Sequence, residues 1–221
     1  MSFWEHLSNL ADVVSMGFAA AMIATGLVFG RAWRAAGIWC GLIGAGMMLV
    51  VASKIAYLGW GWGICRWNFT GFSGHATRAM AIAPVFFHLI LNRTSLPLQR
   101  AGVLLGIAFG FAAGMSRLAL HVHSLSEVVA GWLLGGTVAL LFIWSGKDQE
   151  EPNRQNFELN KFAAIFGILI LAALPAPGSG TTQKVLVELS IFLSKHEVAF
   201  SRNDCAVQLA RLQNWYIHSS F

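Results

Sequence analysis

One polar stretch of the sequence, residues 116–127, lies between two apolar runs and holds side chains that could carry chemistry. It contains a guanidinium, two imidazoles, a carboxylate and several hydroxyls, in the order Ser116-Arg117-Leu-Ala-Leu-His121-Val-His123-Ser-Leu-Ser-Glu127. An unsatisfied polar group in lipid costs several kcal/mol. Such a cluster between hydrophobic runs therefore indicates a functional site.

The spacing of His123 and Glu127 suits nucleophilic chemistry. Residues four apart share a face of a helix, so the carboxylate could hydrogen-bond one ring nitrogen and leave the other free to attack. Arg117 adds a planar fork of donors that matches phosphate oxygens. Two ordinary interpretations stay open: Ser124 and Glu127 also fit a helix capping box, and a lone arginine at a helix end often extends to the membrane surface.

A second polar stretch, Phe72-Ser73-Gly74-His75, stands where another apolar run begins. Backbone N–H groups at a helix N-terminus bind anions, glycine lets an anion come close, and histidine can carry a proton at physiological pH. The alternative is an N-capping serine followed by an interfacial histidine. The rest of the chain must act as a scaffold that holds the two stretches against each other.

The composition indicates what that scaffold is. Of the 221 residues, 56% are hydrophobic and 11% are charged, whereas a soluble domain carries about 25% charged residues. We therefore expect an all-α integral membrane bundle. We attribute the net charge of +5 to basic residues that set the orientation in the membrane. The sequence has no basic patch interleaved with aromatic residues, so we expect no nucleic-acid partner.

The apolar runs predict about six transmembrane helices after a short interfacial helix at residues 3–10. The spans lie near 13–30, 36–58, 76–91, 101–115, 128–144 and 162–174, and the last is shorter than the roughly 20 residues needed to cross untilted. Residues 1–177 are expected to form the transmembrane domain. Residues 178–221 are expected to form a tail on the outer side, partly helical near 185–193.

Six spans place the loops after spans two and four on one face, where both polar stretches meet. The site face carries Lys54, Arg66, Arg78, Arg117 and four basic residues of the tail, so a raw count does not decide the orientation. If the first four are set aside as site residues, the positive-inside rule marks the opposite face as cytoplasmic, with Arg31, Arg34, Arg93, Arg100, Lys147, Arg154 and Lys161. We therefore expect a multi-pass protein of the bacterial inner membrane whose site opens to the periplasm or exterior. Cys65 and Cys205 could pair on that face, but three sparse cysteines make no disulfide framework, and the sequence favours free thiols.

The motif Ser116-Arg117-x5-His123-x3-Glu127, followed by Val-Val-Ala-Gly131, resembles the third signature of the type 2 phosphatidic acid phosphatase superfamily. Phe72-Ser73-Gly74-His75 resembles its second signature, usually Pro-Ser-Gly-His. The resemblance covers about residues 50–145, and two linked motifs are more specific than one. It implies a phosphatase that needs no metal or other cofactor, forms a phosphohistidine intermediate, and acts on a lipid phosphate or diphosphate in the bilayer.

The resemblance also implies residue roles. His123 corresponds to the nucleophile, and His75 corresponds to the acid that protonates the leaving oxygen. Arg117, Ser73 and Gly74 correspond to phosphate ligands. Glu127 stands where the family usually has the aspartate that orients the nucleophile. Its extra methylene moves the carboxylate by about 1.5 Å, so either the backbone compensates or the enzyme is slow.

The first family signature is altered. It consists of lysine, six residues, arginine and proline. Lys54 fits the lysine and a phosphate-binding role, but Gly61 occupies the arginine position and no proline follows. Arg66 and Arg78 are the candidate replacements.

Three other functions share these residues. Imidazole and carboxylate groups at His75, His121, His123 and Glu127 could bind zinc, although their spacing matches no metalloprotease motif. A catalytically impaired relative would use Lys54 and Arg117 only to bind anionic lipid headgroups. A lipid phosphotransferase would use the same site with a different acceptor.

Overall fold

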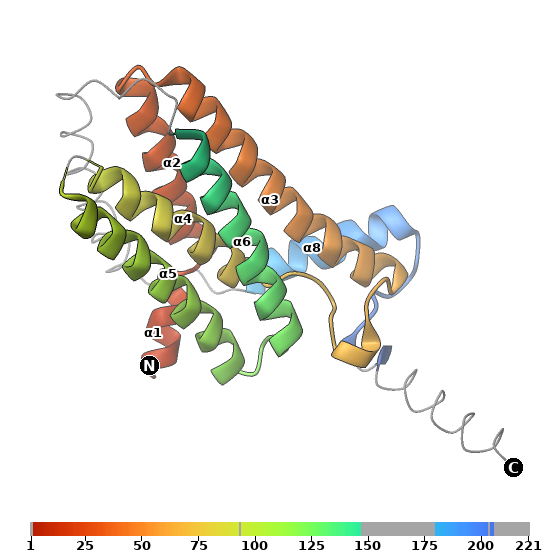
Figure 1. The fold of residues 1–221 in the computed structure, drawn as a ribbon. Coiled ribbons are helices and arrows are strands. Elements are labelled where there is room, and N and C mark those ends of the chain that lie inside the picture. Colours follow the sequence, from red (N-terminus) through yellow and green to blue (C-terminus); the bar gives the residue numbers. More distant parts are fainter. Residues whose placement is uncertain (1, 93, 147–179, 203, 206–221) are drawn as a thin grey trace, which may run out of the picture.

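The computed structural model describes residues 2–92, 94–146, 180–202 and 204–205, and these residues form a helical bundle (Figure 1). Its helices are α1 (Phe3–Leu10), α2 (Val13–Phe29), α3 (Trp33–Trp60), the 3-10 turn η1 (Cys65–Trp67), α4 (Gly74–Ile90), α5 (Leu96–Ala119), α6 (Leu125–Ser145) and α8 (Gly180–Ser194). The described residues contain no β-strand beyond one isolated bridge between Ile64 and Phe69. The predicted all-α class is confirmed.

The helices match the predicted spans, and several are longer at their ends than hydropathy alone indicated. The stretch Phe3–Phe29 and the helices α3, α5 and α6 are long and apolar enough to cross a membrane. Large apolar side chains on them face outward, such as Met48 at 71% exposure and Leu133 at 69%, as lipid contact requires. The predicted sixth span, 162–174, and the charged loop before it lie outside the described residues.

The central helix is α4, which packs against α2, α3, α5 and α6 (Figure 1). Close approach depends on glycine at two positions of α6: a Cβ atom at Gly131 would lie 2.8 Å from the Ser73 carbonyl oxygen, and one at Gly135 would lie 2.3 Å from that of Thr77. The backbones of α4 and α6 therefore touch. This contact brings the two polar stretches together at one end of the bundle.

The other half of the bundle is apolar. Its core joins α2, α3, α4 and α6 around Trp39, Ile82 and Val85, which are at most 2% exposed. The Trp39 indole N–H donates to the Ala20 carbonyl at 3.0 Å, which satisfies its single polar group. The buried charged residues Asp12, Arg117 and Glu127 instead lie toward the end where α3 and α5 finish and α4 and α6 begin.

The described part of the tail, residues 180–202 and 204–205, folds back onto this polar end. Helix α8 confirms the predicted tail helix and lies beside the C-terminal half of α3 (Figure 1). Cys65 in η1 and Cys205 form a disulfide with Cα atoms 5.2 Å apart. The preference for free thiols was wrong here, because the fold brings together cysteines that are 140 residues apart in sequence. Cys40 remains free on α3.

Candidate active site

A polar cavity of about 690 Å³ occupies the end of the bundle where the two signature stretches meet. It is formed by the α1–α2 junction, the end of α3, the start of α4, the end of α5, the loop before α6, and the tail from α8 onward. Among the lining residues, the charged and imidazole side chains are mostly cationic or able to become so, with Asp12 as the acidic member: Asp12, Lys54, His75, Arg78, Arg117, His123 and Arg202. Such a lining suits an anionic ligand.

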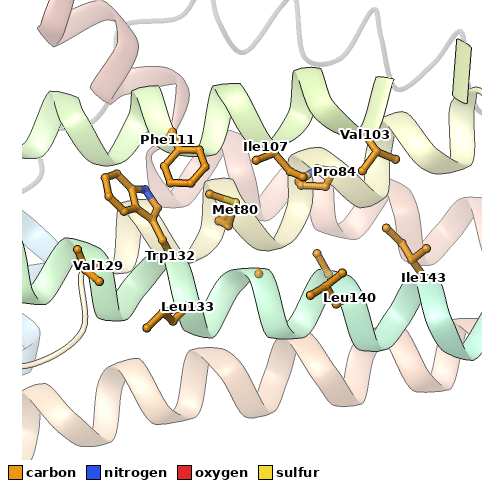
Figure 2. Close-up of a pocket in the computed structure, with 12 residues that line it drawn as sticks. Met80, Pro84, Val103, Ile107, Phe111, Val129, Trp132, Leu133, Leu140 and Ile143 are labelled. Carbon is orange, nitrogen blue, oxygen red and sulfur yellow. The ribbon is translucent and has the colours of Figure 1, made fainter. Parts of the chain in front are cut away.

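A second cavity is unsuited to chemistry. It is an apolar groove of about 370 Å³ between α4, α5 and α6, into which Met80, Phe111 and Trp132 project (Figure 2). The Trp132 indole N–H is already satisfied by the Gly110 carbonyl at 3.0 Å. The groove is lined without any titratable side chain, so we place the active site in the polar cavity.

His123 is held by Glu127 as the spacing predicted. The Nδ1 atom of His123 lies 2.6 Å from Oε2 of Glu127, and because a carboxylate only accepts, Nδ1 donates and Nε2 keeps its lone pair. His123 lies in the loop before α6 with 12% of its side chain exposed. Burial lowers the pKa of His123, while the hydrogen bond to Glu127 opposes this effect. A neutral imidazole with a free Nε2 is the nucleophilic form.

Glu127 also completes the capping box, so both sequence interpretations hold together. Its Oε2 accepts from the Ser124 N–H at 3.1 Å, and the Ser124 hydroxyl accepts from the Glu127 N–H at 3.4 Å. Its Oε1 accepts from the Thr70 N–H at 3.0 Å and from the Thr70 hydroxyl. The carboxylate is fully buried. Nothing in the sequence pointed to Thr70, because it lies 57 residues from Glu127 and just before the Phe72–His75 motif, outside it.

Arg117 is buried, with 9% exposure, which rules out the interpretation that it extends to the membrane surface. One of its terminal nitrogens, Nη1, donates to the Ser8 hydroxyl at 2.5 Å. Ser8 belongs to α1, which packs on α5. The sequence predicted α1 as an interfacial helix. It gave no sign that α1 contributes to the site, because Ser8 and Arg117 are 109 residues apart.

His75 stands in the first turn of α4 between two charged partners. Its Nδ1 lies 3.5 Å from Nη2 of Arg78, and its Nε2 lies 3.5 Å from Oδ1 of Asp12. The preceding Ser73 donates its backbone N–H to the Glu127 carbonyl at 3.1 Å, which ties the second signature to the third. Asp12 was missed by the sequence reasoning, and its place just before α2 marks it only as an N-cap.

Several buried donors in or next to the cavity have no protein partner. Among the described residues, four buried side-chain polar atoms make no hydrogen bond, and three of them belong to predicted phosphate ligands: Ser73 Oγ, Arg78 Nε and Arg117 Nε. Buried polar groups are normally paired. Arg78 and Arg117 line the cavity, and Ser73 directly precedes the lining residue Gly74, so these atoms fit a site that hydrogen-bonds an anion.

The structure separates the candidates for the altered first signature. Lys54 lines the cavity, and so does Arg78. Arg66 is exposed on η1 and is not part of the cavity lining. Gly61 adopts a left-handed conformation with φ of 70° at the turn that ends α3, so this position serves the turn. The sequence also missed Arg202, whose Nη2 lies 2.5 Å from Oε2 of Glu127.

The four candidate zinc ligands do not converge. His121 is exposed in a left-handed turn with φ of 56° and is not part of the cavity lining. Among the residues the structure describes, no group of three or more histidine, cysteine or acidic side chains is placed to hold a metal ion. The geometry therefore gives the zinc hypothesis no support.

Comparison with known proteins agrees with the site. The model of the PAP2 superfamily matches residues 60–151. A Klebsiella pneumoniae relative, described as an uncharacterized 22.5 kDa protein in the cps region, is 32% identical over 202 residues, which cover 91% of this chain and 96% of the relative. No solved structure matches significantly. The chain belongs to the PAP2 superfamily.

Proposed function

We propose that the protein hydrolyses a phosphomonoester or diphosphate of a membrane lipid through a phosphohistidine intermediate. The observation that carries the proposal is His123, whose Nδ1 is hydrogen-bonded to a fully buried carboxylate inside a cavity lined by cations. This arrangement orients an imidazole for attack and provides donors for the charge of a transferring phosphoryl group.

In the first step, Nε2 of His123 attacks phosphorus, and the bond from phosphorus to the leaving oxygen breaks. The protonated form of His75 donates a proton to that oxygen. Burial lowers the pKa of His75 to about 4, and Asp12, 3.5 Å away, opposes this shift and favours the protonated form. Arg117, Arg78, Lys54 and the N-terminus of α4 receive the phosphoryl oxygens. In the second step, water loses a proton to His75 and attacks phosphorus, which releases inorganic phosphate and restores neutral His123.

We also propose that the protein is a bacterial inner-membrane protein with its cavity on the periplasmic side. The end of the bundle opposite the cavity carries Arg31, Arg34 and Arg100, as the positive-inside rule expects of a cytoplasmic end. The disulfide between Cys65 and Cys205 lies at the cavity end. Disulfides persist in oxidising compartments such as the periplasm, so this bond supports the same orientation.

The test is phosphate release by the detergent-purified protein from phosphatidic acid, phosphatidylglycerol phosphate and polyprenyl diphosphate, with excess chelator. We expect release that resists the chelator, is blocked by vanadate and is lost in His123→Ala. The matched control is His121→Ala, an exposed histidine two residues away, which should retain activity.

Each other outcome has a meaning. Loss of release on chelation would identify a metal hydrolase. Transfer of labelled phosphate to an added lipid alcohol in place of water would identify a phosphotransferase. Folded protein that binds these lipids without releasing phosphate from any of them would identify a headgroup-binding relative and overturn the proposal.

A further inference from the structure

After α8, residues 199–202 line the polar cavity, and together with residues 204–205 they are called the strap here. The Phe200 N–H donates to the Leu58 carbonyl at 2.8 Å, and the Tyr57 hydroxyl donates to the Ser201 carbonyl at 2.7 Å. At its far end the disulfide fixes Cys205 to η1. Contacts on both sides of Arg202 therefore attach the strap to the end of α3 and to η1.

Arg202 brings a positive charge to the carboxylate that orients His123. Its Nη2 lies 2.5 Å from Oε2 of Glu127 and 3.3 Å from the Val122 carbonyl oxygen. The same Oε2 accepts from Nδ1 of His123. A guanidinium donates several hydrogen bonds in a fixed plane, so Arg202 holds both the carboxylate and the loop that carries His123.

We propose that Arg202 is a positioning residue of the active site, supplied by the tail through the strap, and that the Cys65–Cys205 disulfide keeps it in place. The proposal deepens the function proposed above and rests on it. The strap also explains why a side chain is disfavoured at the altered position of the first signature. The position where the family has an arginine is Gly61, and a Cβ atom there would lie 3.2 Å from the Phe200 ring of the strap. The strap covers that turn and delivers its own arginine two residues later.

The charge balance around His123 gives the proposal a specific consequence. Besides His123, the charged and titratable groups in or beside the cavity are Glu127 of α6, Lys54 and Tyr57 of α3, Arg117 of α5, His75 and Arg78 of α4, Asp12 before α2, and Arg202 of the strap. When a buried carboxylate loses one cationic partner, protonation of its remaining histidine partner becomes more favourable. Removal of Arg202 should therefore raise the pKa of His123.

The sign of the pH effect follows from the protonation state of the nucleophile. Burial lowers the pKa of His123, so the wild-type acid limb of kcat/KM should lie below the ordinary histidine value of about 6.5. Protonated His123 cannot attack, and activity falls as the pH drops through its pKa. In Arg202→Gln the limb should move to higher pH. Arg202→Lys, which keeps the charge but loses the planar fork, should leave the limb near its wild-type position.

The experiment compares phosphate release by wild type, Arg202→Gln and Arg202→Lys across pH. We expect kcat of Arg202→Gln to fall on the order of 10²-fold, as for a misplaced catalytic group, with a smaller change in KM. The matched control is Lys184→Gln, which removes an exposed positive charge from α8 outside the cavity lining and should behave as wild type. A wild-type pH profile and kcat in folded Arg202→Gln would overturn the proposal.

The disulfide is tested by a double-mutant cycle. Cys65→Ser with Cys205→Ser should lower kcat and shift the acid limb in the same direction as Arg202→Gln. If the disulfide acts through Arg202, adding Arg202→Gln to that background should change little further. Losses that multiply would show that the disulfide acts elsewhere, which would overturn the second part of the proposal.

A measurement without turnover separates this inference from the proposed function. The pKa of His123 is read by NMR titration of ring-labelled histidines, assigned by comparison with His123→Ala. A higher pKa in Arg202→Gln than in wild type supports the positioning role even if no tested lipid releases phosphate. An unchanged pKa would contradict that role even if wild type is an active phosphatase.

Discussion

At the scale of single residues, the Glu127 carboxylate is fully buried and both of its oxygens are engaged. The sequence raised the concern that the extra methylene, compared with the aspartate usual in the family, misplaces the carboxylate. In the structure, the extra methylene brings the carboxylate within reach of its partners. From the first turn of α6, the side chain reaches His123, the Ser124 N–H, Thr70 and Arg202. The site is built around glutamate.

The first prediction follows from this geometry. Glu127→Asp should lower kcat for phosphate release by about 10²-fold, because it withdraws the carboxylate by roughly one C–C bond, about 1.5 Å, from its partners. The measurement is the release assay on protein whose fold is verified by gel filtration. The control is the same exchange at exposed Glu188 of α8, which should be silent. Full activity of Glu127→Asp would mean that the loop before α6 adjusts freely.

At the scale of elements, contact between α4 and α6 places the two signatures against each other. Two adjacent glycines of α6 differ sharply in their surroundings. A Cβ atom at Gly135 would lie 2.3 Å from the Thr77 carbonyl oxygen, whereas one at Gly136 would meet only Met80 Cγ, at 3.8 Å. The first contact is with backbone and has no flexible group that could move aside.

The second prediction uses this pair of glycines. Gly135→Ala should push α4 away from α6, destabilise the protein by about 1–3 kcal/mol as overpacking does, and reduce phosphate release. Gly136→Ala should keep activity and could gain up to about 1 kcal/mol from helix propensity. Thermal unfolding and the release assay on both variants are the measurements. Equal stability of the two variants would show that a methyl group fits between the backbones of α4 and α6 at Gly135.

At the scale of the whole molecule, the length of α3 separates the two faces of the bundle. Its 28 residues span about 42 Å at 1.5 Å per residue, more than the roughly 30 Å of a bilayer core. Arg34 is exposed at its start, and Trp62 is 73% exposed just beyond its end, on the side of the cavity. The two positions should therefore face opposite sides of the membrane.

The third prediction is an orientation. In intact cells, with Cys40 replaced by alanine, a membrane-impermeant maleimide should label Trp62→Cys and leave Arg34→Cys unlabelled. Permeabilised cells should show labelling of both, which is the control for accessibility. The reverse pattern would place the cavity in the cytoplasm and would remove the support that the disulfide gives to the periplasmic orientation.

The sequence alone determined the features that depend on neighbours along the chain. The helices arise from long apolar runs. The contact between His123 and Glu127 and the capping box both depend on short spacings along the chain at the start of α6, although His123 lies in the loop and not on the helix. The alternation of spans across a membrane also predicted that Ser73 and Glu127 lie on one face. These features needed no knowledge of how helices pack.

Only the tertiary structure decided which distant side chains complete the site. Ser8 reaches Arg117, Thr70 and Arg202 reach Glu127, and Asp12 reaches His75, each across more than 50 residues. The Cys65–Cys205 disulfide is of the same kind. Such contacts leave no periodic pattern in the sequence, because they depend on the packing of α1 on α5 and of the tail on α3, and on the close approach that glycine allows between α4 and α6.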